Sequence, residues 1–222
     1  MILIAEAGGT RTDWRSIDGD QIGQFTTIGF NYATSDFAGY LGEIKDQLLD
    51  YPHVQSVFFY SAGIIDPDKA QNEAALAFES HIHVEKIYVF NDQLAAARAL
   101  CLNTPGWVGT LGTGSSLCYY DGNRITERIP PLGYILGDEG SAVYMGKNLV
   151  RLYLRGQLPR EIENKLRNRF DIREESVIHS VYQQGKGRET FAGFSRFLMQ
   201  QKNDPFIYSF LYRNFKEYFM AF

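Results

Sequence analysis

The sequence predicts an α/β protein of two similar halves, in which mixed sheets are covered by helices. Three observations support this prediction. Short apolar runs alternate with helix-like segments over the first hundred residues. A glycine-rich turn follows the first apolar run of each half, at residues 6–10 (EAGGT) and 112–115 (GTGS). From about residue 138 onward, apolar residues recur at helical spacing, so this part is expected to be almost wholly helical.

The first half follows the order βββαβαβα, an antiparallel meander continued by crossover units. Strands are expected at residues 2–5, 13–17, 22–27, 56–60 and 86–90. Ser35 or Asp36 is expected to cap a helix that runs to about residue 49. Asp66 and Pro67 open a second helix, which runs to about residue 79. An alanine-rich helix follows Asp92 and ends near residue 100.

The turn cluster at residues 103–106 (NTPG) is the predicted domain boundary. It divides the chain into an N-terminal domain, residues 1–104, and a C-terminal domain, residues 105–222. After it the pattern restarts with strands at 107–111, 116–120 and 124–128, and with a hairpin turn at 121–123 (DGN). The helices are expected near residues 140–154, 158–169, 174–184, 189–201 and 205–220.

Composition excludes several classes of function. The net charge is −4 and there is no polybasic run, so neither nucleic acid nor a membrane surface is an expected partner. Cys101 and Cys118 form no disulfide framework or metal-ligand cluster, and the four histidines match no metal spacing. No apolar stretch approaches the roughly 18 residues that span a bilayer. The N-terminal apolar run is interrupted by Glu6 and is not a signal peptide. We expect a cytoplasmic protein.

The two glycine-rich turns are candidate phosphate sites. Successive backbone N–H groups in such a turn form a concave anion site, and the Thr and Ser hydroxyls add donors. Two turns about a hundred residues apart therefore suggest one polyphosphate held from two sides. A hairpin with glycine at its tip is the alternative for each turn taken singly.

Two carboxylates stand where helices begin. Asp92 follows a strand, where a general base for a substrate hydroxyl would lie in an open α/β sheet, although Asn91 or Asp92 could simply cap the helix. Asp138 also opens a helix, and it too has two interpretations: a ligand for a polyol, or a helix cap. Asn31 and Ser61 lie in turns, and from the residues alone a turn role explains Asn31 better than a ligand role, while Ser61 could likewise be only part of a strand-to-loop turn.

The order of these motifs over residues 2–148 resembles that of the N-acetylglucosamine kinase family and of the related BadF/BadG-type ATPases. Both belong to the superfamily of sugar kinases, actin and chaperone ATPases. The segment 5–14 (AEAGGTRTDW) is similar to the first phosphate loop of that superfamily, and 111–115 (LGTGS) to the second. Residues 89–92 (VFND) resemble the segment that carries the catalytic aspartate, and 136–142 (LGDEGSA) the motif on the sugar side.

The resemblance implies two ribonuclease-H-like (actin-like ATPase) domains around a cleft, and a kinase that uses ATP and Mg²⁺ on the 6-hydroxyl of an amino sugar. Asp92 would be the base, Asn31, Ser61, Asp92 and Asp138 would bind the sugar, and Glu6 would serve the metal. The ATP phosphates would be held by Gly8, Gly9, Thr10, Thr12, Gly112, Thr113, Gly114 and Ser115.

Two departures from the family pattern affect the expected activity. Glu6 replaces the aspartate of the first loop, and its longer side chain is expected to displace the metal or to slow the reaction. The family's adenosine-binding glycine loop is not found between residues 150 and 222, which predicts a truncated C-terminal domain and weak nucleotide affinity. The apolar face of the last helix has two explanations, missing residues or a homodimer partner.

Two alternatives to the kinase stay open. One is a BadF-type ATPase, which would couple ATP hydrolysis to a partner. The other is a catalytically degenerate sugar-binding or sensor protein, for which Glu6 is the main argument.

Overall fold

The computed structural model describes residues 1–9, 11–64, 66–130 and 132–221. The chain divides into two compact units. The first comprises Met1–Gly106 and Tyr120–Ile125, and the second comprises Trp107–Tyr119 and Thr126–Phe222.

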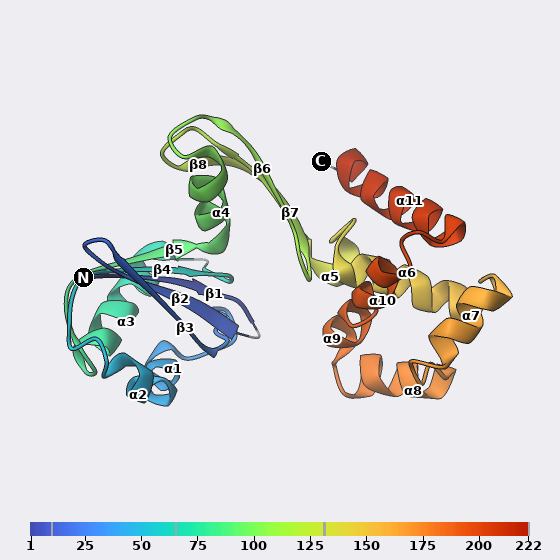
Figure 1. Cartoon of the computed structure of the whole chain (residues 1–222), viewed down its shortest axis with the longest axis horizontal. Coiled ribbons are helices and arrows are strands. Elements are labelled where there is room, and N and C mark those ends of the chain that lie inside the picture. Colours follow the sequence, from blue (N-terminus) through green and yellow to red (C-terminus); the bar gives the residue numbers. More distant parts are fainter. Residues whose placement is uncertain (10, 65, 131, 222) are drawn as a thin grey trace. The chain divides into compact units, whose positions relative to one another are not determined.

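Five strands form the sheet of the first unit, in the order β3-β2-β1-β4-β5 (Figure 1). They are β1 (Ile2–Ala7), β2 (Arg11–Asp18), β3 (Gln21–Ile28), β4 (His53–Ser61) and β5 (His83–Asn91). The β1–β2 and β2–β3 pairs are antiparallel, whereas the β1–β4 and β4–β5 pairs are parallel. The expected mixed sheet is confirmed, and the carboxyl ends of β1, β3, β4 and β5 all lie at one edge of it.

Helices cover both faces of this sheet unequally. Figure 1 shows α1 (Phe37–Glu43), α2 (Lys45–Leu48) and α3 (Pro67–Glu79) on one side and α4 (Asp92–Cys101) on the other. The Asp66 side chain caps α3 by accepting from the Lys69 N–H, with Pro67 at the first helical position, as expected. The single helix expected over 36–49 is instead two helices, because Ile44 leaves the helical conformation at φ −103° and ψ 8°.

The core of the first unit lies between the sheet and α1–α3. Its sheet side is one row of paired residues, in which Ala5 is paired with Trp14 and Phe59, and Phe59 with Val89. The Trp14 ring lies 5.9 Å from the Phe59 ring, and both side chains are fully buried. On the helix side the core includes Phe37, Tyr40, Leu41, Ile44, Leu48, Ala70, Ala74, Ala77 and Phe78.

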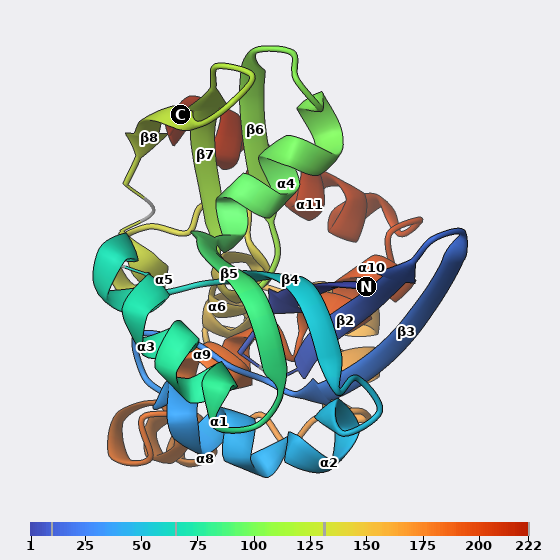
Figure 2. The same cartoon turned by 90° about the vertical axis from the view of Figure 1, so that its left-hand side faces the viewer.

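Strands β4 and β5 begin three residues earlier than expected, at His53 and His83. His83 therefore lies in a strand and not in a solvated loop. The buried Val54 is flanked by the exposed His53 and Gln55, and residues 83–85 are exposed or half-buried, so the apolar pattern does not reveal these starts. His53 and His83 are nevertheless paired in register. Figure 2 shows β4 and β5 side by side.

The second unit contains most of a second sheet, of order β6-β7-β8, formed by β6 (Gly106–Leu111), β7 (Ser115–Tyr120) and β8 (Ile125–Ile129). The remainder is helical, as expected. Its helices are α5 (Gly133–Leu136), α6 (Ala142–Leu154), α7 (Arg160–Arg167), α8 (Glu174–Ile178), the π-helical turn η1 (His179–Gln183), α9 (Gly187–Ala192), α10 (Ser195–Gln200) and α11 (Pro205–Ala221). The helix expected over 189–201 is interrupted at Gly193 and Phe194, where glycine is a weak helix former.

The apolar face of α11 is largely buried within the second unit itself. Ile207, Phe210 and Leu211 belong to its hydrophobic core, and the Tyr218 hydroxyl donates to the Ser116 carbonyl oxygen at 3.0 Å. Phe219 is 74% exposed. This face thus has a cover inside the chain, and the homodimer stays a prediction. In the described part of the chain, the search for a helix long and apolar enough to cross a membrane finds none.

Replacing Phe59 by alanine is predicted to destabilise the first unit by about 3–5 kcal/mol, because the cavity left between the sheet and α1–α3 cannot close fully. The free energy of unfolding in urea measures this loss. Ile22→Ala on β3 is the control, since Ile22 is 74% exposed and its truncation should change stability by only about 0.5 kcal/mol. Equal losses for the two variants would contradict the assignment of Phe59 to the core.

Candidate functional site

The first glycine-rich turn is a tight connection between β1 and β2. The Gly8 N–H donates to the Arg11 carbonyl oxygen at 3.0 Å. The Gly8 carbonyl oxygen in turn accepts from the Phe30 N–H at 3.0 Å, which ties the turn to the loop after β3. A Cβ atom on Gly9 would meet no other atom within 4 Å, so the turn is open on that side. Thr10 lies outside the described residues.

Thr12 does not lie on the open side of the first glycine-rich turn. It is fully buried on β2, paired with Ala7 and Thr27, and its hydroxyl donates to the Ile28 carbonyl oxygen at 3.0 Å. That hydroxyl already has a backbone partner on the face of the sheet that α1–α3 cover. The predicted phosphate contact of Thr12 is therefore not favoured by its geometry and stays a prediction.

Three carboxylates gather near the carboxyl end of the sheet, on the face opposite α1–α3. Glu6 is paired with Asp13 in the β1–β2 register. Partial burial, followed by the negative charges of Asp92 and Asp13, raises the pKa of Glu6, and the opposing effect of Arg11 is smaller. Asp13 accepts from the Arg11 Nε and from the Thr26 hydroxyl, both at 3.1 Å. Such a crowd of carboxylates favours a bound cation or a shared proton.

Asp92 is the first residue of α4 and directly follows β5. Asn91 is the N-cap, and its side chain accepts from the Gln93 N–H at 3.0 Å. One Asp92 carboxylate oxygen accepts from the same N–H at 2.9 Å. The capping interpretation is thus correct for Asn91, and one Asp92 oxygen adds to the same cap. Asp92 is half-buried, at the edge where four strands end.

Asn31 and Ser61 belong to two loops that are joined to one another. The Tyr32 N–H donates to the Ala62 carbonyl oxygen at 3.1 Å. The Asn31 side-chain oxygen accepts from the Ala33 N–H at 3.0 Å, and the buried Ser61 hydroxyl donates to the Ala62 carbonyl oxygen at 2.9 Å. The turn interpretation thus holds for both residues, and the first unit brings both to the edge where Glu6 and Asp92 lie.

The second glycine-rich turn lies against the start of α6. The Ala142 and Val143 N–H groups at the first turn of this helix donate to the carbonyl oxygens of Gly112 and Thr113, at 3.0 and 3.2 Å. The cap of α6 is Ser141, whose hydroxyl accepts from the Tyr144 N–H. Asp138 is therefore not the cap that one interpretation expected.

Asp138 is joined to the second glycine-rich turn. Its carboxylate accepts from the Ser115 N–H at 3.3 Å, and its backbone adopts φ +61°, which is rare outside glycine. A Cβ atom on Gly114 would lie 3.0 Å from both carboxylate oxygens, so a side chain there would press against the Asp138 carboxylate. Burial raises the pKa of Asp138, against the Ser115 hydrogen bond and the Arg188 charge. The Ser115 hydroxyl is buried and has no hydrogen-bond partner among the described residues.

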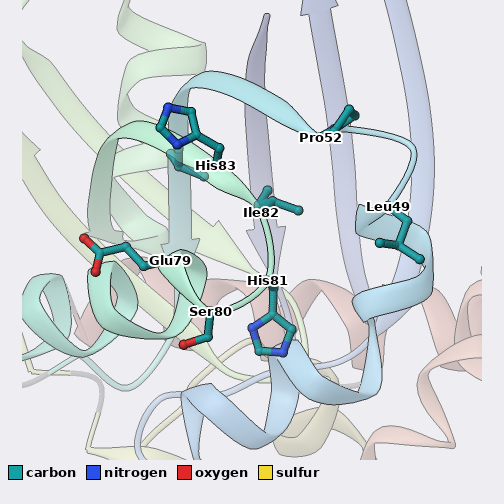
Figure 3. Close-up of a pocket in the computed structure, with 8 residues that line it drawn as sticks. Leu49, Pro52, Glu79, Ser80, His81, Ile82 and His83 are labelled. Atoms are coloured by element: carbon teal, nitrogen blue, oxygen red, sulfur yellow. The ribbon is translucent and has the colours of Figure 1, made fainter.

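A hollow of about 560 Å³ lies at the amino ends of β4 and β5, at the opposite edge of the sheet from Glu6 and Asp92. Figure 3 shows the His81 and His83 rings pointing away from each other. The Nδ1 atom of His81 lies 2.9 Å from the Ala77 carbonyl oxygen. The polar groups that line this hollow do not converge, so the hollow is not our candidate functional site.

The described residues contain no group of three or more His, Cys, Asp or Glu side chains arranged to hold a metal ion. Any divalent ion near Glu6 would therefore take most of its ligands from water and substrate, which is the usual behaviour of Mg²⁺.

The mixed sheet, its covering helices and the glycine-rich turns define the class of protein: an α/β protein with the fold of a solved structure that is named as a sugar kinase. A solved structure from Porphyromonas gingivalis, named as a proposed N-acetylglucosamine kinase, is 33% identical with a TM-score of 0.86, over 100% of this chain and 80% of that one. At this identity over its whole length, the chain belongs to the N-acetylglucosamine kinase family, which confirms the resemblance seen in the sequence.

A second structure has the same fold at much lower identity. This protein from Chromobacterium violaceum, also named as a proposed N-acetylglucosamine kinase, is 16% identical with a TM-score of 0.68, over 94% of this chain and 77% of that one. No protein-family model and no curated protein matches the chain.

The pattern of the sequence did not single out every residue that shapes the site. Arg98, in the alanine-rich helix after Asp92, contacts two aromatic rings of the sheet. A lone basic residue among alanines was the available signal. Gly63 is another residue that the sequence did not single out. Its φ is +81°, and a Cβ atom there would overlap Asn31 and Ala33, so it lies where the Asn31 and Ser61 loops meet.

Gly63→Ala is predicted to destabilise the first unit by about 2–3 kcal/mol. The new Cβ would lie 2.3 Å from the Asn31 side-chain oxygen and 2.6 Å from the Ala33 nitrogen, at a positive φ. Gly19→Ala is the matched control: its φ is +59° and nothing lies within 4 Å, so only about 1 kcal/mol is expected. Urea unfolding compares the two, and equal losses would mean that the two loops are not tightly joined.

With Asp138→Asn, the free energy of unfolding is predicted to fall less than in the wild type as the pH rises from acid values. A raised pKa means that the folded protein binds more protons than the unfolded chain, so stability falls as pH rises from the usual value of 3.8 through the raised value. Asparagine keeps the acceptor for the Ser115 N–H and removes the titration. The variant should therefore gain stability relative to the wild type across this window, in urea unfolding at a series of pH values.

Asp121→Asn provides a control of opposite sign for this experiment. Backbone hydrogen bonds from Arg124 and Asn123 lower the pKa of Asp121, so its ionised form stabilises the native protein and that contribution is lost as pH falls. Relative to the wild type, this variant should lose stability as pH rises through the lowered value up to 3.8. The same sign in both variants would contradict the assignment of the Asp138 shift to burial.

Proposed function

We propose that this protein is an ATP-dependent kinase that phosphorylates the 6-hydroxyl of an amino sugar, N-acetylglucosamine in the first place. One observation carries the proposal: Asp92 stands half-buried at the sheet edge that also holds Glu6, the first glycine-rich turn and the Asn31 and Ser61 loops. Membership of the family supports the same assignment, since the proposed activity is the one in the names of the two similar proteins.

Asp92 is the proposed general base. A carboxylate that begins a helix at the end of a strand is held by the backbone of both elements, and one of its oxygens is fixed by the Gln93 N–H. The other oxygen would accept the proton of the sugar 6-hydroxyl as that oxygen bonds to the γ-phosphorus of ATP. The bond from the γ-phosphorus to the bridging oxygen breaks, and ADP leaves with the electron pair.

The sugar would be oriented by Asn31, Ser61 and Asp138, and the phosphates would be held by the two glycine-rich turns. The described residues of those turns are Gly8, Gly9, Gly112, Thr113, Gly114 and Ser115. Three of these support the assignment directly: Gly9 is unobstructed, the buried Ser115 hydroxyl has no partner among the described residues, and Gly114 permits the approach of Asp138.

Glu6 is the proposed contact to Mg²⁺ or to its bound waters. Partial burial, and then the nearby negative charges of Asp92 and Asp13, raise the pKa of Glu6, which expresses the cost of ionising its carboxylate there. A divalent cation would remove that cost, so the residues fit a magnesium ion. When bound, the ion would neutralise charge on the transferred phosphoryl group. Because the chain offers few ligands here, waters and phosphate oxygens would complete its shell. The two cysteines, Cys101 and Cys118, are not joined in a disulfide, which fits the proposed location in the cytoplasm, where ATP is available.

Asp92→Asn is predicted to lower sugar-dependent ADP release by about 10²–10⁴-fold, the contribution of a positioned general base. The measurement is a coupled ADP-release assay with Mg-ATP against a panel of amino sugars and hexoses. Asp68→Asn is the matched control, since Asp68 is likewise an acidic residue in the first turn of a helix, α3, but that helix covers the other face of the sheet (Figure 1). It should leave the rate unchanged.

Three results would count against this proposal, the first against the role of Asp92 and the other two against the kinase. Sugar-dependent release that survives Asp92→Asn would remove Asp92 as the base. ATP hydrolysis without any dependence on sugar would favour an ATPase of the BadF type. Sugar binding by calorimetry without turnover would favour a sensor, with Glu6 as the disabling residue.

A further inference from the structure

The face of the first sheet that carries Glu6 and Asp13 also carries a set of aromatic side chains. We define the aromatic platform as Phe58, Tyr60, Tyr88 and Phe90. Phe58 is paired with Tyr88, and Tyr60 with Phe90, in the parallel β4–β5 register. The paired rings lie 5.0 and 5.4 Å apart, and the Tyr88 and Phe90 rings are parallel within 1°. Paired positions of neighbouring strands point to the same face, so the platform is one continuous surface.

Arg98 of helix α4 reaches the end of this platform, beside the fully buried Ala97 of the same helix. The Arg98 guanidinium carbon lies 4.4 Å from the centre of the Phe90 ring and 6.0 Å from that of Tyr60. One guanidinium nitrogen also donates to the Tyr60 hydroxyl at 2.9 Å. Tyr60 is only 8% exposed, whereas Phe90 and Arg98 are half-buried, so these contacts are partly shielded from water, which strengthens cation–π attraction.

The same helix begins with Asp92. Arg98 lies six positions after Asp92 in the sequence, which corresponds to about 9 Å along an α-helix. The start of α4 is fixed by the strand pair of Asn91 with Ser61 and by the Asn91 cap, but a fixed start does not set the direction of a helix axis. A second attachment further along the helix sets the direction of its axis. The contacts of Arg98 with Phe90 and Tyr60 supply such an attachment.

We propose that Arg98 is a positioning residue: its stacking on Phe90 and its hydrogen bond to Tyr60 hold α4 at a defined angle on the sheet and thereby aim the Asp92 carboxylate. This inference rests on the proposed function, in which Asp92 is the base. A guanidinium suits this task better than an ammonium group, because its plane can lie on a ring while its edge donates to a hydroxyl. Misplacing a reacting group by about 1 Å costs on the order of 100-fold in rate.

The test uses Arg98→Met and Arg98→Lys in the full chain. Methionine keeps the apolar stem and removes the guanidinium, whereas lysine keeps the charge without the planar group. Arg151→Met is the matched control, since Arg151 is an exposed arginine in the last turn of α6, in the other unit. Tyr60→Phe removes only the hydroxyl acceptor and keeps the ring.

Two readouts are needed, and the first does not require activity. Hydrogen exchange of the backbone amides at residues 94–101 should be about tenfold faster in Arg98→Met than in the wild type, and less affected in Tyr60→Phe. The second is the rate of sugar-dependent ADP release. In Arg98→Met, kcat should fall by about 10- to 100-fold with little change in the KM for sugar, and Arg98→Lys should recover part of the loss.

The two readouts separate failure of this inference from failure of the proposed function. Unchanged exchange in Arg98→Met would overturn the attachment whatever the enzyme does. Faster exchange with an unchanged kcat, in a protein that Asp92→Asn inactivates, would overturn the positioning role and leave the kinase intact. No sugar-dependent turnover in the wild type would overturn the function and, with it, the positioning of a base, while exchange would still report the attachment.

Discussion

The parallel pairing of β1 with β4 and of β4 with β5 is the constraint on which the candidate site depends. Parallel neighbours end at the same edge of a sheet, so Glu6, Ser61 and Asp92 are brought to one edge from distant parts of the sequence. The antiparallel β1–β2–β3 meander adds the first glycine-rich turn and the loop of Asn31. No residue of the site needs a long loop of its own, because strand ends supply the positions.

Much of the first unit could be predicted from the sequence because its signals are local. Pro67 after Asp66 and the apolar runs each report on a few neighbouring residues, and the elements that they predict are found. What failed depends on contacts between distant residues. The break at Ile44 and the early starts at His53 and His83 follow from packing and from register, which no local pattern contains. The predicted domain boundary at residue 104, and the shortening of the C-terminal domain, stay predictions.

The site shows the same division between local and distant information. The motifs locate Asp92 and Asp138 through the residues beside them. They do not reveal that the Thr12 hydroxyl already bonds to Ile28, or that Asp138 lies against Gly114. These are contacts across 16 and 24 residues of chain, visible only once the backbone is folded. The roles of all these residues remain proposals, because a position at a sheet edge supports a role without measuring it.

The electrostatics of Glu6 and Asp138 point in one direction. Both carboxyls have a raised pKa with burial as its first cause, so each makes the native protein less stable at neutral pH than a neutral side chain would. A core built only for stability would place apolar groups there. Glu6 also faces Asp92 and Asp13, so its cost increases as those groups ionise. A bound cation or a donor from a substrate would convert this cost into binding energy, because charges fixed in advance need no reorganisation when their partner arrives. The free-energy cost of ionising these two carboxyls would thus be recovered when a ligand of complementary charge or hydrogen bonding binds them.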